Sequence, residues 1–510
     1  MNPRALHLHL LDNVVVAPTP LPLGTDLGVG AVRSTVAVAQ GHKLALEPIA
    51  FGQPVRKLGQ TIGIATAEIA AGEWVHDHNI RNPEPHEITL ADTSRDAAVS
   101  RSTTRGAALP STFEGYRRKG GSVATRNYIG VLTTVNCSAT VARAIADAFR
   151  GPDALARHSN VDGVVAFTHA TGCGMQAGSE GHAILRRTIE GYMRHPNFAS
   201  VLLIGLGCEV NGLGLYSNVT MPEGSRLDTF DIQSVGGTRA AVRAGISRIE
   251  ASLDHANEAR RESVSAAELV VGLQCGGSDA FSALSANPAL GVAADLLVQN
   301  GGTVLLSETP EVAAWAEQLC ARAESPAIAQ RVRAAVSWWT RYAAANGATL
   351  DGNPSPGNRA GGLSTIAEKA LGAIAKGGSS PLADFIDYAE RVRKRGLVFM
   401  DSPGFDPVSA TGQIASGANL VCFTTGRGSV FGAKPTPSLK LATNSEVFVR
   451  LRDDMDIDCG GVLDGRTDLE TLGREIYLRM LATASGERTS SERLGIGDNE
   501  FAPWQLGAVL

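Results

Sequence analysis

Short apolar runs alternate with longer amphipathic stretches through most of the chain after residue 128. The runs have the length of buried strands and lie at 128–135, 163–168, 201–206, 269–273, 303–306, 396–400 and 420–423. Helical spacing of apolar positions follows the first two runs, at 139–149 and 180–193. Strands that alternate with helices predict an α/β fold with mainly parallel sheets.

The first ninety residues show a different pattern. Apolar and polar residues alternate with period two at 6–10, which predicts a half-buried strand, and the stretch 41–79 has short apolar runs broken by glycines. A polar segment rich in Thr, Ser, Arg and Pro follows, which is typical of a linker. We therefore expect a small, mostly β domain at 1–92, a linker at 93–112, an α/β lobe at 113–260, and a second α/β lobe with the C-terminal region at 261–510. A charged helix at 248–263 is expected where the two lobes meet.

Composition narrows the class of protein. A chain of 510 residues is long enough for about three domains. The net charge of −5 and 5% aromatic content predict no general affinity for nucleic acid, and no apolar run has the length of a membrane span. The N-terminus shows no secretory signal, and seven cysteines, an odd number, predict reduced thiols and a cytoplasmic location.

Four cysteines share one position relative to the predicted strands. Each lies just beyond the carboxyl end of a strand, where open α/β sheets bind ligands; they are Cys137, Cys173, Cys208 and Cys275. Cys320 and Cys422, in contrast, fall inside predicted elements, as buried structural cysteines do. Three thiolates can hold an iron–sulfur cluster and leave one iron open as a Lewis acid. The alternative is that the four are small core residues, and no C-x-x-C pair supports a local metal site.

Histidines of the β domain form a second candidate site. His76 and His78 are two residues apart, so on a strand they would point to the same face and could share one metal ion. His42 and Lys43 place a candidate general base and a cation in one turn. Solvated surface histidines and an ordinary charged hairpin are the competing interpretations.

Three glycine-containing loops are suited to hold a carboxylate. The segment 275–279 offers Ser278 and Asp279 at a strand end, and the loop 353–362 carries Asn358 and Arg359 ahead of a helix predicted at 365–375. Arg427 stands in a similar turn after the strand at 420–423 and could grip a carboxylate with two hydrogen bonds. Tight turns with surface arginines are the alternative in each case.

The remaining patterns mainly exclude functions. The chain contains no G-x-G-x-x-G dinucleotide loop at the expected place, no G-x-x-x-x-G-K-[ST] phosphate loop and no G-x-S-x-G nucleophile turn. An acidic stretch is expected to be a solvated face, with a hard-cation site as the alternative; its carboxylates are Asp453, Asp454, Asp456 and Asp458.

Several motifs, in the same order along almost the whole chain, resemble the altronate and galactarate dehydratases. They are GYR at 115–117, GSVATRN at 121–127, GCG at 172–174, IGLGCE at 204–209, CGGSD at 275–279, ANP at 286–288, NPSPGN at 353–358 and TGRG at 425–428. The first ninety residues, with GHK at 41–43 and HDHN at 76–79, resemble the SAF-like β-clip domain at the N-terminus of that family. Some motifs are similar to the altronate branch and others to the galactarate branch.

The resemblance implies a hydro-lyase that converts a hexonate or hexarate to a 2-keto-3-deoxy acid with the help of Fe²⁺, or of Mn²⁺ in its place. Under this hypothesis His76 and His78 bind the metal, and the general base is His42, Lys43 or His169. Arg427, Ser278, Asp279 and the loop with Asn358 and Arg359 would hold the substrate.

Alternative functions remain open at this stage. The chain could be an iron–sulfur lyase that uses the strand-end cysteines, a sulfo-lyase acting on sulfolactate, or a non-catalytic sugar-acid sensor. The expected partner is a small-molecule sugar acid, with neither nucleic acid nor membrane, and the sequence leaves a homo-oligomer open.

Overall fold

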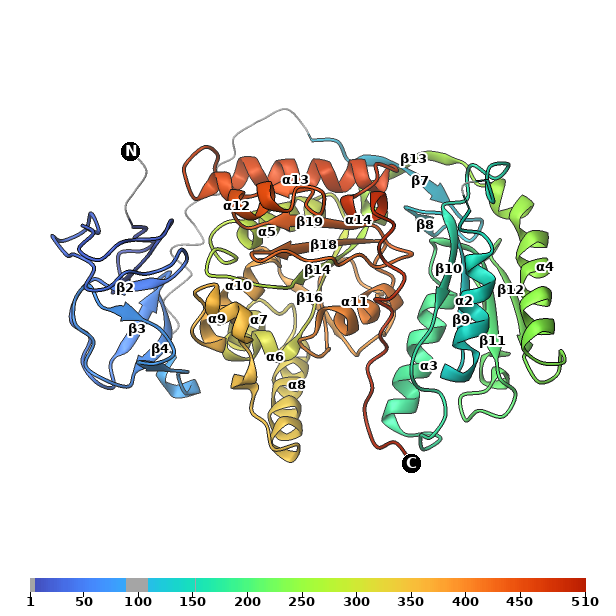
Figure 1. The fold of residues 1–510 in the computed structure, drawn as a ribbon, viewed down its shortest axis with the longest axis horizontal. Helices are drawn as coiled ribbons and strands as arrows, with labels where there is room; N and C mark the ends of the chain where they lie inside the picture. The colour runs from blue at the N-terminus through green and yellow to red at the C-terminus, as the bar shows by residue number, and fades with distance from the viewer. Residues whose placement is uncertain (1–4, 89–108, 152) are drawn as a thin grey trace.

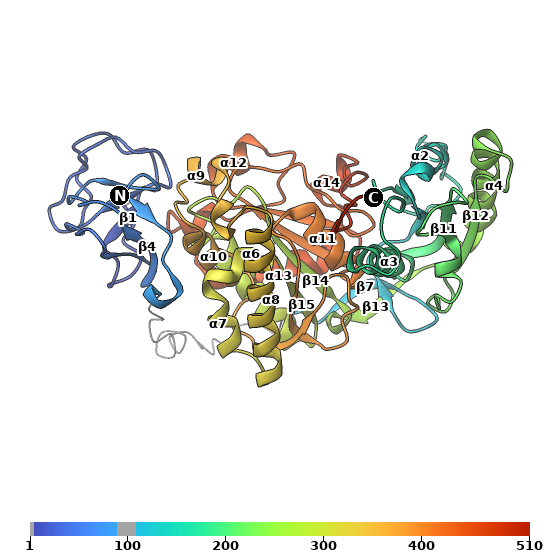
Figure 2. The same cartoon turned by 90° about the horizontal axis from the view of Figure 1, so that it is seen from below.

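The fold is described by a computed structural model for residues 5–88, 109–151 and 153–510. The β domain, a large α/β lobe and a smaller α/β lobe lie in a row, and in both views the large lobe stands between the other two (Figures 1 and 2). The α/β fold class and the β-rich N-terminal region predicted from the sequence are confirmed. Among the described residues, no helix has the length and apolar character needed to cross a bilayer.

The β domain consists of two antiparallel three-stranded sheets. One has the order β1(Val14–Val16), β2(Lys43–Ala45), β5(Trp74–Val75), and the other has the order β3(Pro54–Lys57), β4(Gln60–Ala65), β6(Ile80–Arg81), followed by the 3-10 turn η1(Pro85–Glu87). The strand expected at 6–10 is wrong. Only Leu6 bridges to Val16, because the Asp12 amide bonds back to the His9 carbonyl and turns the chain away, leaving Leu10 93% exposed.

The smaller lobe is a four-stranded parallel sheet in the order β10(Gly163–Phe167), β9(Tyr128–Thr133), β11(Phe198–Gly205), β12(Arg226–Asp231). Apolar side chains of α2(Ala139–Asp147) and α4(Thr238–Asn257) share one core with the sheet, while α3(Glu180–Met193) shares another with the large lobe. Its 3-10 turns are η2(Asn136–Ser138) and η3(Leu213–Tyr216). The helix expected at 248–263 stops at Asn257.

The chain passes between the lobes through a small antiparallel sheet. It has the order β13(Arg261–Ser265), β7(Thr112–Arg117), β8(Val123–Ala124), and η4(Ala266–Glu268) follows β13. Arg261 to Ser265 therefore form a strand where a charged helix was expected, because their backbone groups pair with β7 from the start of the lobe.

The large lobe is built on a seven-stranded sheet in which every pair is parallel. Its order is β16(Leu382–Ile386), β17(Gly396–Met400), β15(Thr303–Leu306), β14(Val270–Cys275), β18(Leu420–Thr425), β19(Ser438–Ala442), β20(Ile457–Asp458). The surrounding helices are α5(Ala286–Gln299), α6(Thr309–Val312), α7(Ala316–Ala321), α8(Pro326–Ala345), α9(Pro356–Ala360), α10(Ile366–Ala375), α11(Asp406–Ala415), α12(Ser445–Arg450), α13(Leu469–Ala484) and α14(Ser490–Arg493). The 3-10 turns are η5(Ala313–Trp315), η6(Leu350–Gly352) and η7(Gly460–Val462).

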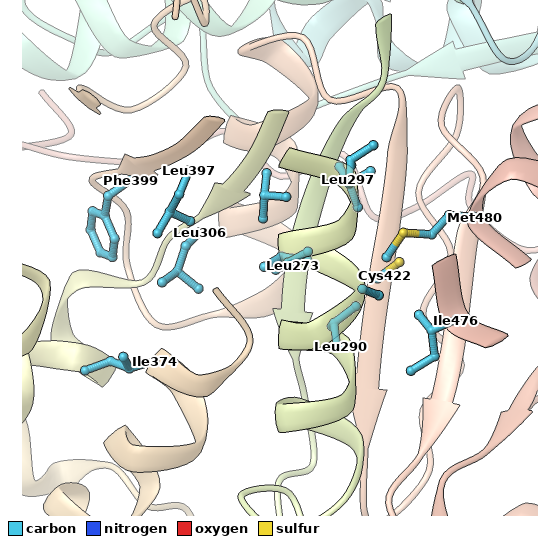
Figure 3. Close-up of a cluster of buried hydrophobic side chains, with 14 of the residues drawn as sticks. Leu273, Leu290, Leu297, Leu306, Ile374, Leu397, Phe399, Cys422, Ile476 and Met480 are labelled. Carbon is cyan, nitrogen blue, oxygen red and sulfur yellow. The ribbon is translucent and has the colours of Figure 1, made fainter. Parts of the chain in front are cut away.

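The core of this lobe lies between the sheet and helices α5, α10 and α13. Leu290 and Leu297 of α5 pack on strand residues such as Leu273 (Figure 3). Ile476 and Met480 of α13 lie beside Cys422 in the same core. Both cysteines expected to be structural, Cys320 and Cys422, are buried here. This core holds the strands in place, and the loops at their carboxyl ends are where binding and catalytic residues are expected.

Candidate active site at the carboxyl edge of the seven-stranded sheet

The strand order reverses at β14. The chain leaves β14 for β15 on one side, and later places β18 on the other side, so the loops after β14 and β18 meet at the reversal point. They pack so closely that a Cβ on Gly426 would lie 2.0 Å from the Asp279 Cγ atom. The start of α11, after β17, also comes close, because a Cβ on Gly276 would lie 2.3 Å from the Asp406 Oδ2 atom. Open α/β sheets bind ligands at such a point.

Ser278 and Asp279 lie at this point but are occupied by the protein. Asp279 is buried and accepts hydrogen bonds from the hydroxyls of Thr443 and Ser282 and from the Asn444 amide. Burial raises the pKa of the Asp279 carboxyl, and the hydroxyls of Thr443 and Ser282 counteract the rise. The Ser278 hydroxyl is 2.8 Å from the Cys275 thiol. These groups shape the loop, and their polar atoms are bonded to other groups of the protein.

The β domain is joined to this edge by a buried ionic triad. Lys43 Nζ donates to both Glu368 oxygens, at 3.0 and 2.8 Å, and Lys57 Nζ donates to one of them at 2.9 Å. Burial alone would raise the pKa of Glu368, but the two ammonium groups lower it to about 2. Burial lowers the pKa of Lys43 to about 8. Lys43 is therefore a cross-link between two domains, with its three donors already engaged.

The histidines of the β domain pack against loop 353–362. Trp74 Nε1 donates to His42 Nδ1 at 3.1 Å, so the proton of the neutral His42 ring is on Nε2, which faces the Ala360 carbonyl at 3.4 Å. Burial, followed by the charge of His76, lowers the pKa of His42 to about 4. With its one lone pair taken by Trp74, His42 is a poor general base in this arrangement.

The premise that His76 and His78 lie on one strand is wrong. Strand β5 ends at Val75, and residues 76–79 form a turn because the Asn79 side chain accepts from the His76 amide. The ring nitrogens of His76 face two acceptors, the Asp77 carboxylate at 2.6 Å and the Arg359 carbonyl at 3.0 Å. The rings of His78 and Trp74 are in contact, with centroids 4.8 Å apart and planes tilted by 40°. Neither nitrogen of His76 therefore offers a free lone pair to a metal.

His169 and three of the cysteines belong to the smaller lobe. His169 is buried, with its ring nitrogens 3.0 Å from the Thr133 carbonyl and 3.0 Å from the Thr171 hydroxyl, and burial lowers its pKa to about 4. The three proposed bases thus do not converge, because His42 and Lys43 lie at the β domain.

The four cysteines do not share one edge. Cys275 is buried at the end of β14 in the large lobe, whereas the other three are exposed; these are Cys137, Cys173 and Cys208. The three exposed thiols follow neighbouring strands β9, β10 and β11, and backbone hydrogen bonds connect their loops, Asn136 N to Thr171 O and Asn211 N to Gly172 O. The expectation of one four-cysteine set is therefore wrong, and a three-cysteine group remains.

The other three residues predicted to bind substrate differ in their exposure and in their contacts. Arg427 is exposed in the loop after β18, beside the reversal point. Asn358 is buried, donates to the Ser278 carbonyl at 2.9 Å and caps α9. Arg359 pairs with Asp77 of the β domain at 2.6 Å. Of the three, Arg427 alone has a side chain that is exposed at this edge.

A cluster of buried acids and lysines at the same edge was missed. Glu308 follows β15 in the left-handed conformation, with φ +74°, which is costly for a residue with a side chain. Within the described part of the chain, neither Glu308 carboxylate oxygen has a hydrogen-bond partner, and Lys376 Nζ is 3.6 Å away. Burial, and next the charge of Glu311, raises the pKa of Glu308 well above its usual value. Unsatisfied, strained acids of this kind cluster at functional sites.

Asp406 and Lys369 belong to the same cluster. We call it the acid cluster, and its members are Glu308, Glu311, Lys369, Lys376 and Asp406. Asp406 begins α11 and faces Gly276, and burial together with Glu311 raises its pKa to about 6. Lys369 Nζ donates to Glu311 Oε1 and, at 2.9 Å, to Asn353 Oδ1. Two carboxyls with raised pKa values therefore lie within one polar cluster near the reversal point.

Little space is open beside the reversal point itself. A cavity of about 10 Å³, room for about one water molecule, is lined by Cys275, Ser278, Asp279, Glu311, Glu368 and Lys369 among others. A larger cavity of about 190 Å³ lies at the junction with the β domain, between Asp77 and Arg81 on one side and Asp351 and Arg359 on the other. Within residues 5–88, 109–151 and 153–510, no group of three or more His, Cys, Asp or Glu side chains is placed to hold a metal ion.

One acid of the stretch 453–458 is not solvated. The side chain of Asp456 is fully buried and accepts from the backbone amides of Lys440 and Ser490, at 2.8 and 2.7 Å. The prediction of a solvated face is therefore wrong at this position, because two amides from distant segments need an acceptor there.

Comparisons with known proteins match the chain from end to end. Three family profiles cover it in order: the altronate/galactarate dehydratase SAF domain at 3–83, the D-galactarate dehydratase/altronate hydrolase second domain at 115–257, and the D-galactarate/altronate dehydratase C-terminal region at 266–509. The altronate dehydratase of Escherichia coli K12 is 35% identical over 99% of both chains. The galactarate dehydratase (L-threo-forming) of the same organism is 35% identical over 99% of this chain and 97% of its own.

A relative with another activity is also similar. The (2R)-sulfolactate sulfo-lyase subunit beta of Chromohalobacter salexigens is 32% identical over 75% of this chain and 95% of its own. The two dehydratases thus align over nearly the whole chain, whereas the sulfo-lyase subunit aligns over three quarters of it.

Proposed function

Because this chain belongs to the D-galactarate/altronate dehydratase family of hydro-lyases, we propose that it removes water from a hexonate or hexarate to give a 2-keto-3-deoxy acid. The observation that carries the proposal is the match of all three family profiles in order, including the SAF domain, together with full-length similarity to both dehydratases. The sulfo-lyase alternative has partial coverage. A cytoplasmic location belongs to the same proposal.

A product assay tests this function. The purified protein is incubated with altronate, galactarate and sulfolactate in turn, with and without added Fe²⁺ or Mn²⁺, and 2-keto acid and sulfite are both measured. The proposal expects 2-keto acid from altronate or galactarate. Sulfite from sulfolactate alone would support the sulfo-lyase, and binding of a sugar acid without any product would support a sensor.

We assign the proton transfers to the acid cluster. In the reaction a base takes the C2 proton, the C3 hydroxyl leaves as water after it receives a proton, and the resulting enol becomes a ketone at C2. Asp406, with a pKa of about 6, is largely ionised at neutral pH and suits the base. Burial and the charge of Glu311 raise the pKa of Glu308 well above its usual value, which suits the acid. We propose that Arg427, which is exposed in the loop after β18, binds the substrate carboxylate.

The substrate needs more room than the small cavity at the reversal point offers. A six-carbon acid does not fit a cavity that holds about one water molecule. The proposal therefore requires the β domain or loop 353–362 to move when substrate enters, and the closed contact to expel water during the reaction.

Replacing Glu308 tests the acid assignment. Glu308→Gln keeps the shape of a side chain that accepts no hydrogen bond in the described residues, so the fold should persist while turnover falls by about 10²–10⁴-fold. Glu317→Gln, which alters an exposed carboxylate, is the matched control and should leave turnover unchanged. Equal turnover of the two variants would remove Glu308 from the mechanism.

Metal dependence is a separate proposal. The family resemblance favours Fe²⁺, or Mn²⁺, but the histidines of the β domain do not fit a metal, since both nitrogens of His76 are engaged. A second candidate is an iron–sulfur cluster on the three exposed cysteines, favoured by their placement on hydrogen-bonded loops. The proton transfers above depend on neither group.

Metal and sulfide analysis distinguishes the candidates. Anaerobically purified protein with stoichiometric sulfide and an absorption band near ~400 nm would support the cluster. Iron or manganese without sulfide, unchanged in a Cys137→Ala variant, would support a mononuclear metal. Full activity after complete removal of metals would contradict both.

A further inference from the structure

A second large cavity lies on the opposite edge of the seven-stranded sheet, at the seam between the two α/β lobes. It measures about 590 Å³ and is lined where β14, β15 and β18 begin, at Val270, Thr303 and Asn419. The smaller lobe contributes the C-terminal end of α3 and the loop that follows it. The cavity is therefore distinct from the acid cluster, which lies at the carboxyl ends of the same strands.

The lining of this seam cavity is strongly cationic. Its three carboxylates are Glu190, Glu268 and Glu390, and its six cations are Arg187, Arg194, Arg391, Arg393, Lys394 and Arg395. This density of positive charge contrasts with a chain whose net charge is −5. A concave surface with one sign of charge concentrates counter-ions of the other sign.

The ion pairs present do not neutralise this charge. Arg395 pairs with Glu268 at 3.0 Å, and Arg194 is 3.7 Å from Glu190. Lys394 is 4.0 Å from Asp384, which lies outside the lining. Arg391 and Arg393 are exposed, and neither has an ion-pair partner among the described residues. Two guanidinium groups, each able to make paired hydrogen bonds to an anion, are thus available at the cavity.

Two backbone and hydroxyl features also point to a ligand. The Ser122 hydroxyl is buried in the cavity wall and has no hydrogen-bond partner in the described part of the chain. Ala389, also in the wall, is buried with φ +59°, a strained conformation of the kind found at ligand clamps. An unsatisfied donor and a strained loop are features that a bound anion would explain.

The C-terminal ends of helices explain why some of these cations lie here, but not all of them. Helices α3 and α11 end at this cavity, and their C-terminal carbonyls attract cations such as Arg194. This effect is confined to the last turn of each helix, whereas Arg391 and Arg393 lie in the segment between α10 and α11, just before β17.

We propose that the seam cavity binds a small polyanion that carries at least two carboxylate or phosphate groups. Arg391 and Arg393 would hold its charged groups, and Ser122 would donate to it. A cavity of about 590 Å³ has the size of a small-molecule site, and both lobes line it, so the bound anion would fix one lobe against the other. This site is independent of the proposed dehydration.

Calorimetric titration of the full-length protein tests the proposal. Citrate serves as the carboxylate probe and pyrophosphate as the phosphate probe, first with wild type and then with Arg391→Gln/Arg393→Gln. The matched control is Arg239→Gln/Arg243→Gln, which removes the same charge from the exposed face of α4. We expect binding of at least one probe, weakened at least tenfold in the first variant and unchanged in the control.

Several outcomes would overturn the proposal. They are the absence of binding of either probe at millimolar concentration, an equal loss in both double variants, or a Ser122→Ala variant and Arg391→Gln/Arg393→Gln that both bind as wild type does. Binding is measured without turnover, so this result does not depend on whether the chain dehydrates a sugar acid.

Discussion

Glu368→Gln removes the carboxylate on which the β domain is anchored. Its two partners would remain buried, with Lys43 facing the Gly362 carbonyl at 2.7 Å and Lys57 facing the Ala280 carbonyl at 3.3 Å. Breaking a buried ion pair by removing one partner costs about 3–5 kcal/mol. The shift of the Glu368 pKa from 4.5 to about 2 corresponds to a similar figure, about 3 kcal/mol.

Thermal unfolding of the intact chain measures this loss. For domains of this size 1 kcal/mol shifts the melting temperature by about 2–4 °C, so we expect the first transition to fall by roughly 6–20 °C. The pH dependence has a defined sign. Because the folded pKa is depressed, the contribution of Glu368 is complete above about pH 4.5 and is lost as the pH falls toward about 2.

The matched control is an exposed ion pair. Glu317→Gln breaks the bridge to Arg333, in which both side chains are more than half exposed, and should cost no more than about 1 kcal/mol. A triple variant, Lys43→Met with Lys57→Met and Glu368→Leu, should recover stability because no charge stays buried. If Glu368→Gln melts within 2 °C of Glu317→Gln, the inferred role of the triad is refuted.

Three further predictions concern the site and its surroundings. The rate of product formation should rise through about pH 6 as Asp406 loses its proton, and a pH-independent rate between 5 and 8 would contradict that assignment. Gly426→Ala should lower the free energy of unfolding by about 1–3 kcal/mol, and with it the melting temperature, because its methyl group would meet Asp279. Gly214→Ala meets no atom within 4 Å and should leave the melting temperature unchanged. A thiol reagent should label the native protein at three cysteines and should need unfolding to reach the other four; reaction of more than three without unfolding would be inconsistent with the burial of Cys275, Cys320, Cys422 and Cys459.

The regular elements of the α/β lobes could be predicted well. The strands at 303–306 and 396–400 and the helix at 180–193 have the predicted bounds, because each combines a strong apolar pattern with a clear turn at its end. The SAF-like β domain was also identified, but its details were not. The segment 6–10 has the alternation of a strand, yet a local turn at residues 9–12 prevents pairing beyond one bridge.

Residues of the candidate site could be predicted only where a local sequence motif marks their position. Ser278 and Asp279 were placed correctly at a strand end, because the glycines beside them mark a close approach of two loops. Glu308 was missed, because neither its backbone conformation nor its lack of a hydrogen-bond partner is visible in the sequence around it. The prediction of one four-cysteine set failed because a cysteine just after a strand has the same local sequence pattern whichever sheet the strand belongs to.

Exchange of the substrate C2 hydrogen tests the central assignment most directly. The substrate that gives product is incubated with the protein in D₂O, and loss of the C2 hydrogen is followed by NMR for wild type and for Asp406→Asn. Asp406 makes no hydrogen bond that the change to Asn would break among the described residues, so the fold should persist. The account predicts that C2 hydrogen loss slows at least 100-fold in Asp406→Asn. Loss at the wild-type rate in the folded variant would contradict it.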